Sequence, residues 1–145
     1  REKTVTKVKC FSFRYESGFL IATLPSGRSL FYVRPRLELN EYGRDSLTYE
    51  GVGEQKHWMR IESYGPKITE NLTQAFCRDL LAEAMERLTA AGYQIVMHIH
   101  DEVVLEAPMD ADLNDACRIM SETPTWAPGL KLNAAGYECM FYQKD

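Results

Sequence analysis

The stretch that decides the fold is residues 68–91, ITENLTQAFCRDLLAEAMERLTAA, in which apolar residues recur every four positions. The repeating residues are Ile68, Leu72, Phe76, Leu80, Ala84 and Leu88, with Leu81 and Met85 beside them. This spacing places them on one apolar stripe of a long helix. Thr69 suits the N-cap position, and Gly92 supplies the C-terminal stop. The pattern therefore predicts a helix over residues 69–91 that needs a sheet to cover its stripe.

Strand patterns precede this helix. Residues 18–33 are rich in β-branched and aromatic residues on both sides of residues 24–27, Leu-Pro-Ser-Gly. Because a type I turn prefers Pro second and Gly fourth, these residues predict a β-hairpin. Residues 35–56 are polar and hold three glycines, which favours a loop with short strands. Residues 57–64 favour another strand.

A second hairpin is expected after the helix. Residues 93–97 and 103–106 have the composition of strands, and only a tight connection lies between them. The tip of this hairpin should lie near His100, Asp101 and Glu102. Residues 110–121 then favour a shorter helix, and residues 134–142 favour a last strand.

These patterns together predict an α+β fold, in which an antiparallel sheet with hairpins is packed by one long and one shorter helix. We expect a strand-rich segment over residues 1–65. A segment over residues 66–145 should hold the long helix, the second hairpin, the shorter helix and the last strand. Because 145 residues suit one domain, the two segments are expected to form one compact unit.

Composition narrows the class of protein. With 45% hydrophobic and 26% charged residues, the chain is an ordinary soluble globular protein, and its net charge of −4 argues against a globally basic nucleic-acid binder. No apolar run approaches the roughly 20 residues that span a membrane, so we expect no membrane partner. The four scattered cysteines favour reduced thiols in a cytosol-like compartment. Because the chain begins with Arg1, we expect a piece of a longer chain or a processed chain.

Charge is unevenly spread along the chain. Residues 1–60 hold 11 Lys and Arg against 7 Asp and Glu, whereas residues 61–145 hold 6 against 14. One interpretation is chance variation on two solvated faces. The other is a basic strand-rich arm that contacts a polyanion, beside an acidic section that holds cations.

The chemistry of the chain is concentrated in residues 97–104, Met-His-Ile-His-Asp-Glu-Val-Val. Adjacent strand residues point to opposite sides, so Asp101 and Glu102 would not share one metal equally. One carboxylate would bind the metal and the other would support it, and their oxygen atoms suit Mg²⁺. A charged turn without a function is compatible with the same residues.

Two other classes of protein are compatible with these residues. His98, His100 and Asp101 could serve a zinc or iron hydrolase, because a His-x-His pair on a strand puts both imidazoles on one face. Alternatively, the basic arm could make the chain a non-catalytic domain that binds nucleic acid or protein.

Residues 99–104 resemble the His-Asp-Glu motif in the palm of family A DNA polymerases, the polymerase I-like family. The surrounding sequence is similar to that family as well, and most closely to its bacteriophage branch. The similar segments are residues 64–71, Gln74 with Ala75, residues 78–85, residues 24–28 and residues 126–130. The resemblance thus covers most of residues 19–142.

The resemblance implies a role for each residue that matches the motifs. Asp101 would be one of two catalytic aspartates that bind a pair of Mg²⁺ ions, Glu102 an accessory acid, and His100 a hydrogen-bond partner near the terminal phosphate of the primer. Gln74 would contact the minor groove of DNA. The weaker candidates for contacts with the duplex or its phosphates are Lys67, Asn71 and Arg78.

The resemblance also implies what lies elsewhere in such an enzyme. The family's second metal-binding aspartate and its nucleotide-holding fingers lie upstream, and neither motif occurs here. The chain therefore resembles the C-terminal part of a polymerase, with the rest of that chain upstream, and alone it is expected to be inactive. Primer-template DNA and deoxynucleoside triphosphates would be the partners of the parent, in the cytoplasm of a bacterial host and of phage or prophage origin. Ala75 replaces a family glycine, so the helix departs from the cellular enzymes.

Overall fold

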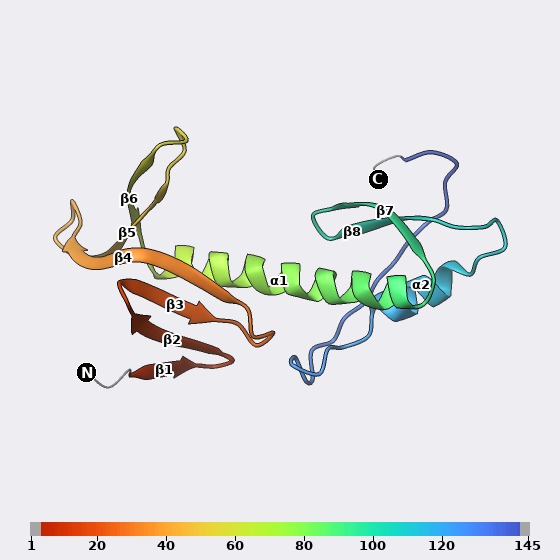
Figure 1. Cartoon of the computed structure of the whole chain (residues 1–145), viewed down its shortest axis with the longest axis horizontal. Coiled ribbons are helices and arrows are strands. Elements are labelled where there is room, and N and C mark those ends of the chain that lie inside the picture. The colour runs from red at the N-terminus through yellow and green to blue at the C-terminus, as the bar shows by residue number, and fades with distance from the viewer. Residues whose placement is uncertain (1–3, 143–145) are drawn as a thin grey trace. The chain divides into compact units, whose positions relative to one another are not determined.

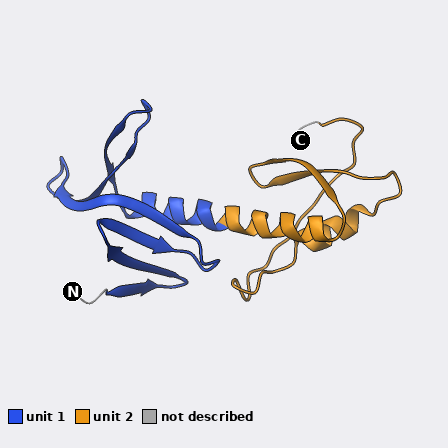
Figure 2. Cartoon of the chain, in the orientation of Figure 1, with its two compact units in different colours: residues 1–76 blue, residues 77–145 orange. Residues whose placement is uncertain are grey.

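The computed structural model describes residues 4–142, which fall into two compact units that divide after residue 76 (Figure 2). The strands are β1 (Val5–Val8), β2 (Phe11–Glu16), β3 (Phe19–Thr23), β4 (Ser29–Leu39), β5 (Asp45–Val52), β6 (Trp58–Ser63), β7 (Gln94–Ile99) and β8 (Glu102–Glu106) (Figure 1). The helices are α1 (Gly65–Ala90) and α2 (Leu113–Met120). The predicted α+β class, with antiparallel hairpins, one long helix and one shorter helix, is confirmed.

The first unit contains a six-stranded antiparallel sheet in the order β1-β2-β3-β4-β5-β6. Every strand pairs with its neighbour in sequence, so the sheet is a series of hairpins. The hairpin predicted over residues 18–33 is confirmed as β3–β4, which pairs Thr23 with Ser29. Its turn is closed by the Gly27 N–H, which donates to the Leu24 carbonyl at 2.9 Å.

Two strand predictions have different outcomes. The strand expected over residues 57–64 is confirmed as β6. Over residues 35–56, where a loop with short strands was expected, strands are present but they are long: β4 continues to Leu39 and β5 occupies Asp45–Val52. The register of β4 against β5 shifts between Val33 and Arg36. This bulge accommodates Pro35, which has no N–H to donate to a ladder.

The core of the first unit lies between the sheet and the first half of α1. Its buried centre consists of Ala22, Tyr32 and Leu72. Partly buried residues of the sheet and the helix surround this centre: Phe11, Phe13, Leu20, Leu30, Tyr49 and Ile68. The sheet therefore covers the start of the apolar stripe, as predicted.

Helix α1 begins four residues before the predicted start. The Ile68 N–H already donates to the Tyr64 carbonyl at 3.1 Å, and Pro66 is tolerated in a first turn because its missing N–H has no helical partner there. Thr69 is not the N-cap, since it lies inside the helix and its hydroxyl donates to the Gly65 carbonyl at 3.0 Å. The stop at Gly92 is confirmed by its φ of 93°.

The second unit has its core around the end of α1. Leu88 is fully buried together with Ala116 and Ile119 of α2. Residues of the β7–β8 hairpin and its flank pack against this centre, together with Met120 of α2: Tyr93, Ile95, Val103 and Leu105. The shorter predicted helix is confirmed as α2, whose N-cap Asp112 accepts a hydrogen bond from the Asn114 N–H at 2.9 Å.

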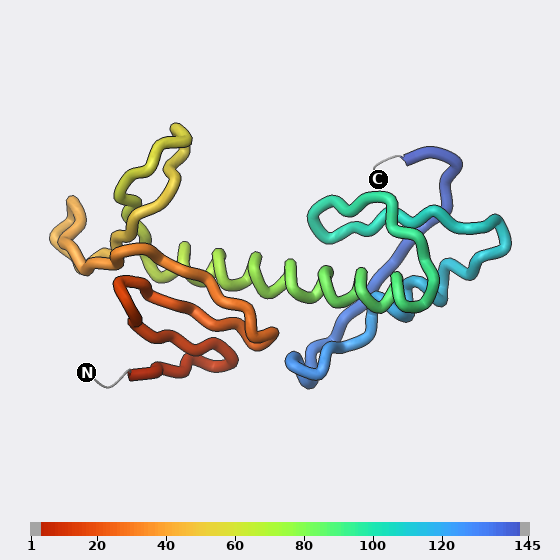
Figure 3. The backbone as a smooth tube through the Cα atoms, in the orientation of Figure 1, coloured from red at the N-terminus to blue at the C-terminus, as the bar shows by residue number. Residues whose placement is uncertain are grey.

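The last strand predicted over residues 134–142 is wrong. After α2 the chain runs without a helix or strand to the end of the described residues (Figure 3). Side chains anchor it instead: the Ala134 N–H donates to the Ser121 hydroxyl at 2.9 Å, and the Trp126 indole N–H donates to Glu83 at 2.5 Å. A strand needs a paired neighbour, and β7 and β8 pair only with each other among the described residues.

The two compact units divide within α1, between Phe76 and Cys77, whereas the sequence suggested a division at residue 65. That the chain forms one compact unit stays a prediction. Within residues 4–142, neither helix combines the length and the apolar character that crossing a membrane requires.

We predict that Leu88→Ala destabilises the protein by about 3 kcal/mol, because it opens a cavity at a fully buried position. Urea unfolding followed by circular dichroism measures the change. The control is Met109→Ala, which also removes a large apolar side chain but from a position that is 87% exposed, so its effect should stay within about 0.5 kcal/mol. Equal losses for both variants would contradict the packing described for α1.

Candidate active site

The tip of the β7–β8 hairpin carries the residues that the sequence singled out. Ile99 pairs with Glu102, so His100 and Asp101 form a two-residue turn. His100, Asp101 and Glu102 are all exposed. The predicted hairpin and the place of its tip are confirmed, while the catalytic roles of the three residues stay predictions.

His100 adopts an uncommon backbone conformation, with a φ of 51°. The turn types that suit two-residue hairpins need a positive φ at the first central position, where Gly, Asn and Asp predominate. A side chain there costs of order 1 kcal/mol, although His tolerates the region better than most residues. The turn therefore holds an imidazole at a position where glycine would fit with less strain.

Within residues 4–142, the carboxylates of Asp101 and Glu102 form no hydrogen bond or ion pair. Both side chains are exposed to solvent. Exposed carboxylate oxygens of this kind can bind a hard cation. Residues 4–142 bring together no group of three or more His, Cys, Asp and Glu side chains that could hold a metal ion, so the tip supplies only part of a coordination shell.

The geometry does not favour the hydrolase alternative. That hypothesis places both imidazoles on one face of a strand. His98 lies in β7 opposite Val103, but His100 lies beyond the last residue of β7, in the turn. The alternative of two histidines on one face of a strand is therefore not favoured.

The predicted DNA-contacting residues lie on α1 at helical spacing. Lys67, Asn71 and Gln74 are separated by four and three positions, so they share one face of the helix. Lys67 and Gln74 are exposed, and Asn71 is half-buried. Arg78 continues the spacing and is also exposed, but it belongs to the second unit. Whether these side chains contact DNA stays a prediction.

Two of these side chains interact with neighbouring groups. The Lys67 ammonium donates to both carboxylate oxygens of Glu70 at 3.0 Å, and this hydrogen bonding and charge raise the pKa of Lys67. Asn71 lies beside the buried hydroxyl of Tyr32, whose pKa is raised by burial and lowered in part by Asn71. The Tyr32 hydroxyl makes no hydrogen bond of ordinary length and angle within the described residues.

Arg28 is a structural contributor that no local pattern in the sequence indicates. Its guanidinium donates to the Ala75 carbonyl at 2.7 Å, which joins the β3–β4 turn to α1 next to Gln74. The turn residues 24–27 and the resemblance of residues 24–28 to the polymerase family both indicated this turn, but neither suggested a contact with the helix.

The chain is similar to DNA polymerases. Over 136 residues, or 92% of its length, it is 48% identical to the DNA polymerase of Bacillus phage SP02. Over 66 residues, or 46% of its length, it is 30% identical to the mitochondrial DNA polymerase I B and to the chloroplastic DNA polymerase I A of Oryza sativa subsp. japonica.

The chain matches only part of each of these relatives. The match spans 21% of the phage protein and 6% of each plant protein. No protein-family model matches the chain, and no solved structure matches it. The chain is therefore similar in sequence to one segment of a DNA polymerase.

We predict that the strained turn distinguishes two substitutions of His100. Val should destabilise the protein by about 1–2 kcal/mol because a β-branched side chain fits a positive φ poorly, whereas Gly should leave the stability unchanged or slightly raised. Urea unfolding reports both. His98→Val is the control, since β7 is extended there and accepts a β-branched residue. If His100→Val and His98→Val have the same stability, the turn is not strained.

Proposed function

We propose that the chain is part of a DNA-directed DNA polymerase of the polymerase I-like family, and that the β7–β8 hairpin carries one of its catalytic carboxylates, Asp101. The observation that carries the proposal is the exposed Asp101-Glu102 pair at a tight turn, whose carboxylates have no partner among the described residues. The chain that presents it is 48% identical to part of a phage DNA polymerase. In this proposal the chain is the C-terminal part, half of the palm, and further segments complete the enzyme.

In this proposal each residue of the hairpin tip has a different task. Asp101 binds a catalytic metal, and Glu102, at the first position of β8, supports that site. His100 orients the primer end through a hydrogen bond near its terminal phosphate. The strained φ of His100 supports this role, because strain at a turn is retained where the side chain has a use. Catalysis here is mostly positioning and neutralisation of charge.

Mg²⁺ fits the donor set of the tip, because carboxylate oxygens are the ligands that it prefers. When bound, a pair of these ions supplies activation of the primer 3′-hydroxyl and neutralisation of the leaving pyrophosphate. Asp101 contributes one ligand. The remaining ligands must come from substrate phosphates and from carboxylates outside this hairpin, since no cluster of three ligand side chains occurs within residues 4–142.

The polar face of α1 supports the second half of the proposal, contact with primer-template DNA. Gln74 is exposed and presents an amide, which can hydrogen-bond to the minor groove without distinguishing the bases strongly. Lys67, Asn71 and Arg78 are assigned to the duplex or its phosphates. Lys67 would exchange its ion pair with Glu70 for a phosphate. Deoxynucleoside triphosphates bind chiefly to segments outside this chain.

We predict that Asp101→Asn lowers primer extension by the full-length protein about a thousandfold or more while DNA binding is largely kept. The reason is that a metal ligand acts on the transition state, whereas affinity comes from many phosphate contacts. Extension is measured on a primed oligonucleotide with Mg²⁺, and binding by fluorescence anisotropy.

Two controls accompany this test. Asp110→Asn removes an exposed carboxylate outside the hairpin and should leave extension unchanged. The 145-residue chain alone should not extend a primer, because it lacks the other metal ligands and the nucleotide-binding segment. Near-normal extension by Asp101→Asn would reject the catalytic role of Asp101. Robust synthesis by the isolated chain would reject the need for further segments.

We further predict that Gln74→Ala in the full-length protein raises the DNA concentration needed for half-maximal extension about fivefold to tenfold, the loss of one hydrogen-bonding side chain. The Mg²⁺ dependence should stay the same, and the loss should be similar for primers of different sequence. Gln55→Ala, an exposed glutamine in the β5–β6 turn, is the matched control. A changed Mg²⁺ requirement, or no change at all, would remove Gln74 from the DNA interface.

A further inference from the structure

The six-stranded sheet has a second side, which faces away from the core that α1 covers and on which Ile21 is buried whereas Phe31 is 59% exposed. We call this side, opposite Ala22 and Tyr32, the outer face. Cross-strand pairing places Arg14, Ile21 and Phe31 in one row of the outer face. The next row contains Glu16, Phe19, Val33, Glu50 and Arg60, each paired with its neighbour. The outer face thus combines aromatic and charged side chains.

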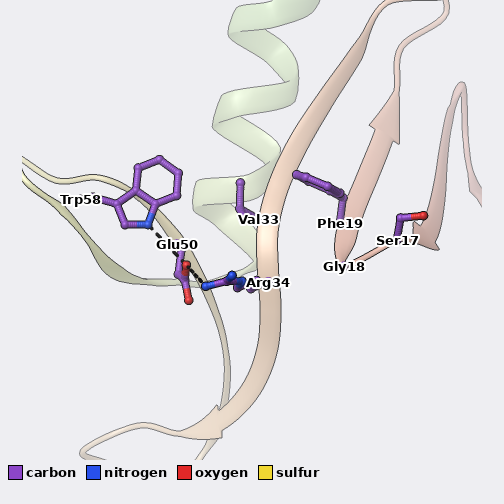
Figure 4. A pocket seen from close by; sticks show the side chains of 7 residues that line it. All are labelled: Ser17, Gly18, Phe19, Val33, Arg34, Glu50 and Trp58. Carbon is purple, nitrogen blue, oxygen red and sulfur yellow. Dashed lines mark hydrogen bonds and ion pairs between the residues drawn. The ribbon is translucent and has the colours of Figure 1, made fainter.

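A shallow concavity of about 410 Å³ lies beside the middle of the second row (Figure 4). Its walls include Phe19, Val33 and Trp58, and Arg34 and Glu50 lie between them. Trp58 is 61% exposed, although it is a large apolar residue. Phe31, which is 59% exposed, makes an edge-to-face pair with Phe19 at a centroid distance of 6.1 Å. Aromatic rings are therefore available to a ligand at the rim and in the wall.

The backbone fixes Arg34 in this concavity. Arg34 has a φ of 44°, at the bulge where the β4–β5 register shifts. Its N–H donates to the Gly18 carbonyl at 2.8 Å, which ties the β2–β3 turn to β4. Bulges re-aim side chains, and strained residues cluster where a ligand binds. The strain at Arg34 therefore points to a use for its guanidinium.

Glu50 holds the groups of the concavity in place. Its carboxylate accepts hydrogen bonds from Arg34 at 3.2 Å, from Arg60 at 3.2 Å and from the Trp58 indole N–H at 3.3 Å. Desolvation raises the pKa of Glu50, but the indole and the two guanidinium groups outweigh it and lower the pKa overall. Two cations thus share one carboxylate, and the side chain of Arg34 remains 70% exposed. The ordered site keeps a net positive charge.

We propose that the outer face binds an unpaired stretch of DNA, with a base stacked on Trp58 and a backbone phosphate on Arg34. Stacking on aromatic rings together with arginine–phosphate contacts is the way proteins hold single strands without reading their sequence. Charge complementarity favours this ligand, because residues 1–60 carry 11 Lys and Arg against 7 Asp and Glu in a chain of net charge −4. The choice of DNA rests on the proposed function.

The chemistry of the face separates this ligand from two others. A duplex keeps its bases stacked on each other, so it cannot offer a base to Trp58. The core of a protein–protein interface is depleted of charged residues, whereas here a carboxylate and two guanidinium groups lie among the aromatic rings. An unpaired strand offers bases that stack on the aromatic rings and phosphates that bind the guanidinium groups.

The test measures binding of a fluorescent 12-nucleotide oligo(dT) to the whole 145-residue chain at low salt. Trp58→Ala should weaken binding about tenfold, Arg34→Gln should weaken it and reduce its salt dependence, and Trp58→Phe should keep most of the affinity. Tyr42→Ala and Arg44→Gln are matched controls, since both residues are exposed in the β4–β5 turn away from the outer face, and they should bind normally.

The outcomes separate this proposal from the proposed function. Asp101→Asn should bind oligo(dT) like the unmodified chain, so a failure of the extension test leaves the binding result intact. Equal affinities of the unmodified chain and Trp58→Ala would overturn the proposal. Equal affinity for a duplex of the same length, or loss of binding in Asp101→Asn, would also overturn it. If the unmodified chain does not bind oligo(dT), the proposal is wrong and the outer face is open to a protein partner instead.

Discussion

The burial of one helix's apolar residues is the interaction on which both compact units depend. Leu72 near the start of α1 closes the core beneath Ala22 and Tyr32, and Leu88 near its end is fully buried against α2. A hairpin of two strands is marginal without something to pack on, so β7 and β8 owe their order to the residues around Leu88. The candidate catalytic tip is consequently only as well positioned as the end of this helix.

Local patterns predicted those elements whose stability comes from neighbours in sequence. The long helix and α2 follow from the spacing of apolar residues, and both hairpins follow from turn residues and a tight connection. The failures share a cause. A strand needs a partner from elsewhere in the chain, so composition alone suggested a strand over residues 134–142, where none forms, and missed the continuous β4–β5 pairing beyond Pro35.

The sequence predicts those parts of the candidate site that form a short motif or a regular spacing. Adjacent acids at a tight connection, and polar residues at helical spacing, can be recognised in the sequence. The positive φ of His100 cannot, and neither can the convergence of Arg34, Glu50 and Trp58, because these three residues come from β4, β5 and β6 and meet only through the register of the sheet. These side-chain contacts depend on how three strands pair along their length, which a local sequence pattern does not indicate.

The two-residue turn of the β7–β8 hairpin also limits how this segment can change over evolution. Side chains alternate between the faces of a hairpin, so inserting or deleting one residue between Ile99 and Glu102 would exchange the sides of every residue that follows in β8. Val103 and Leu105 contribute to the core around Leu88 from this strand. Related chains should therefore keep the length of this turn.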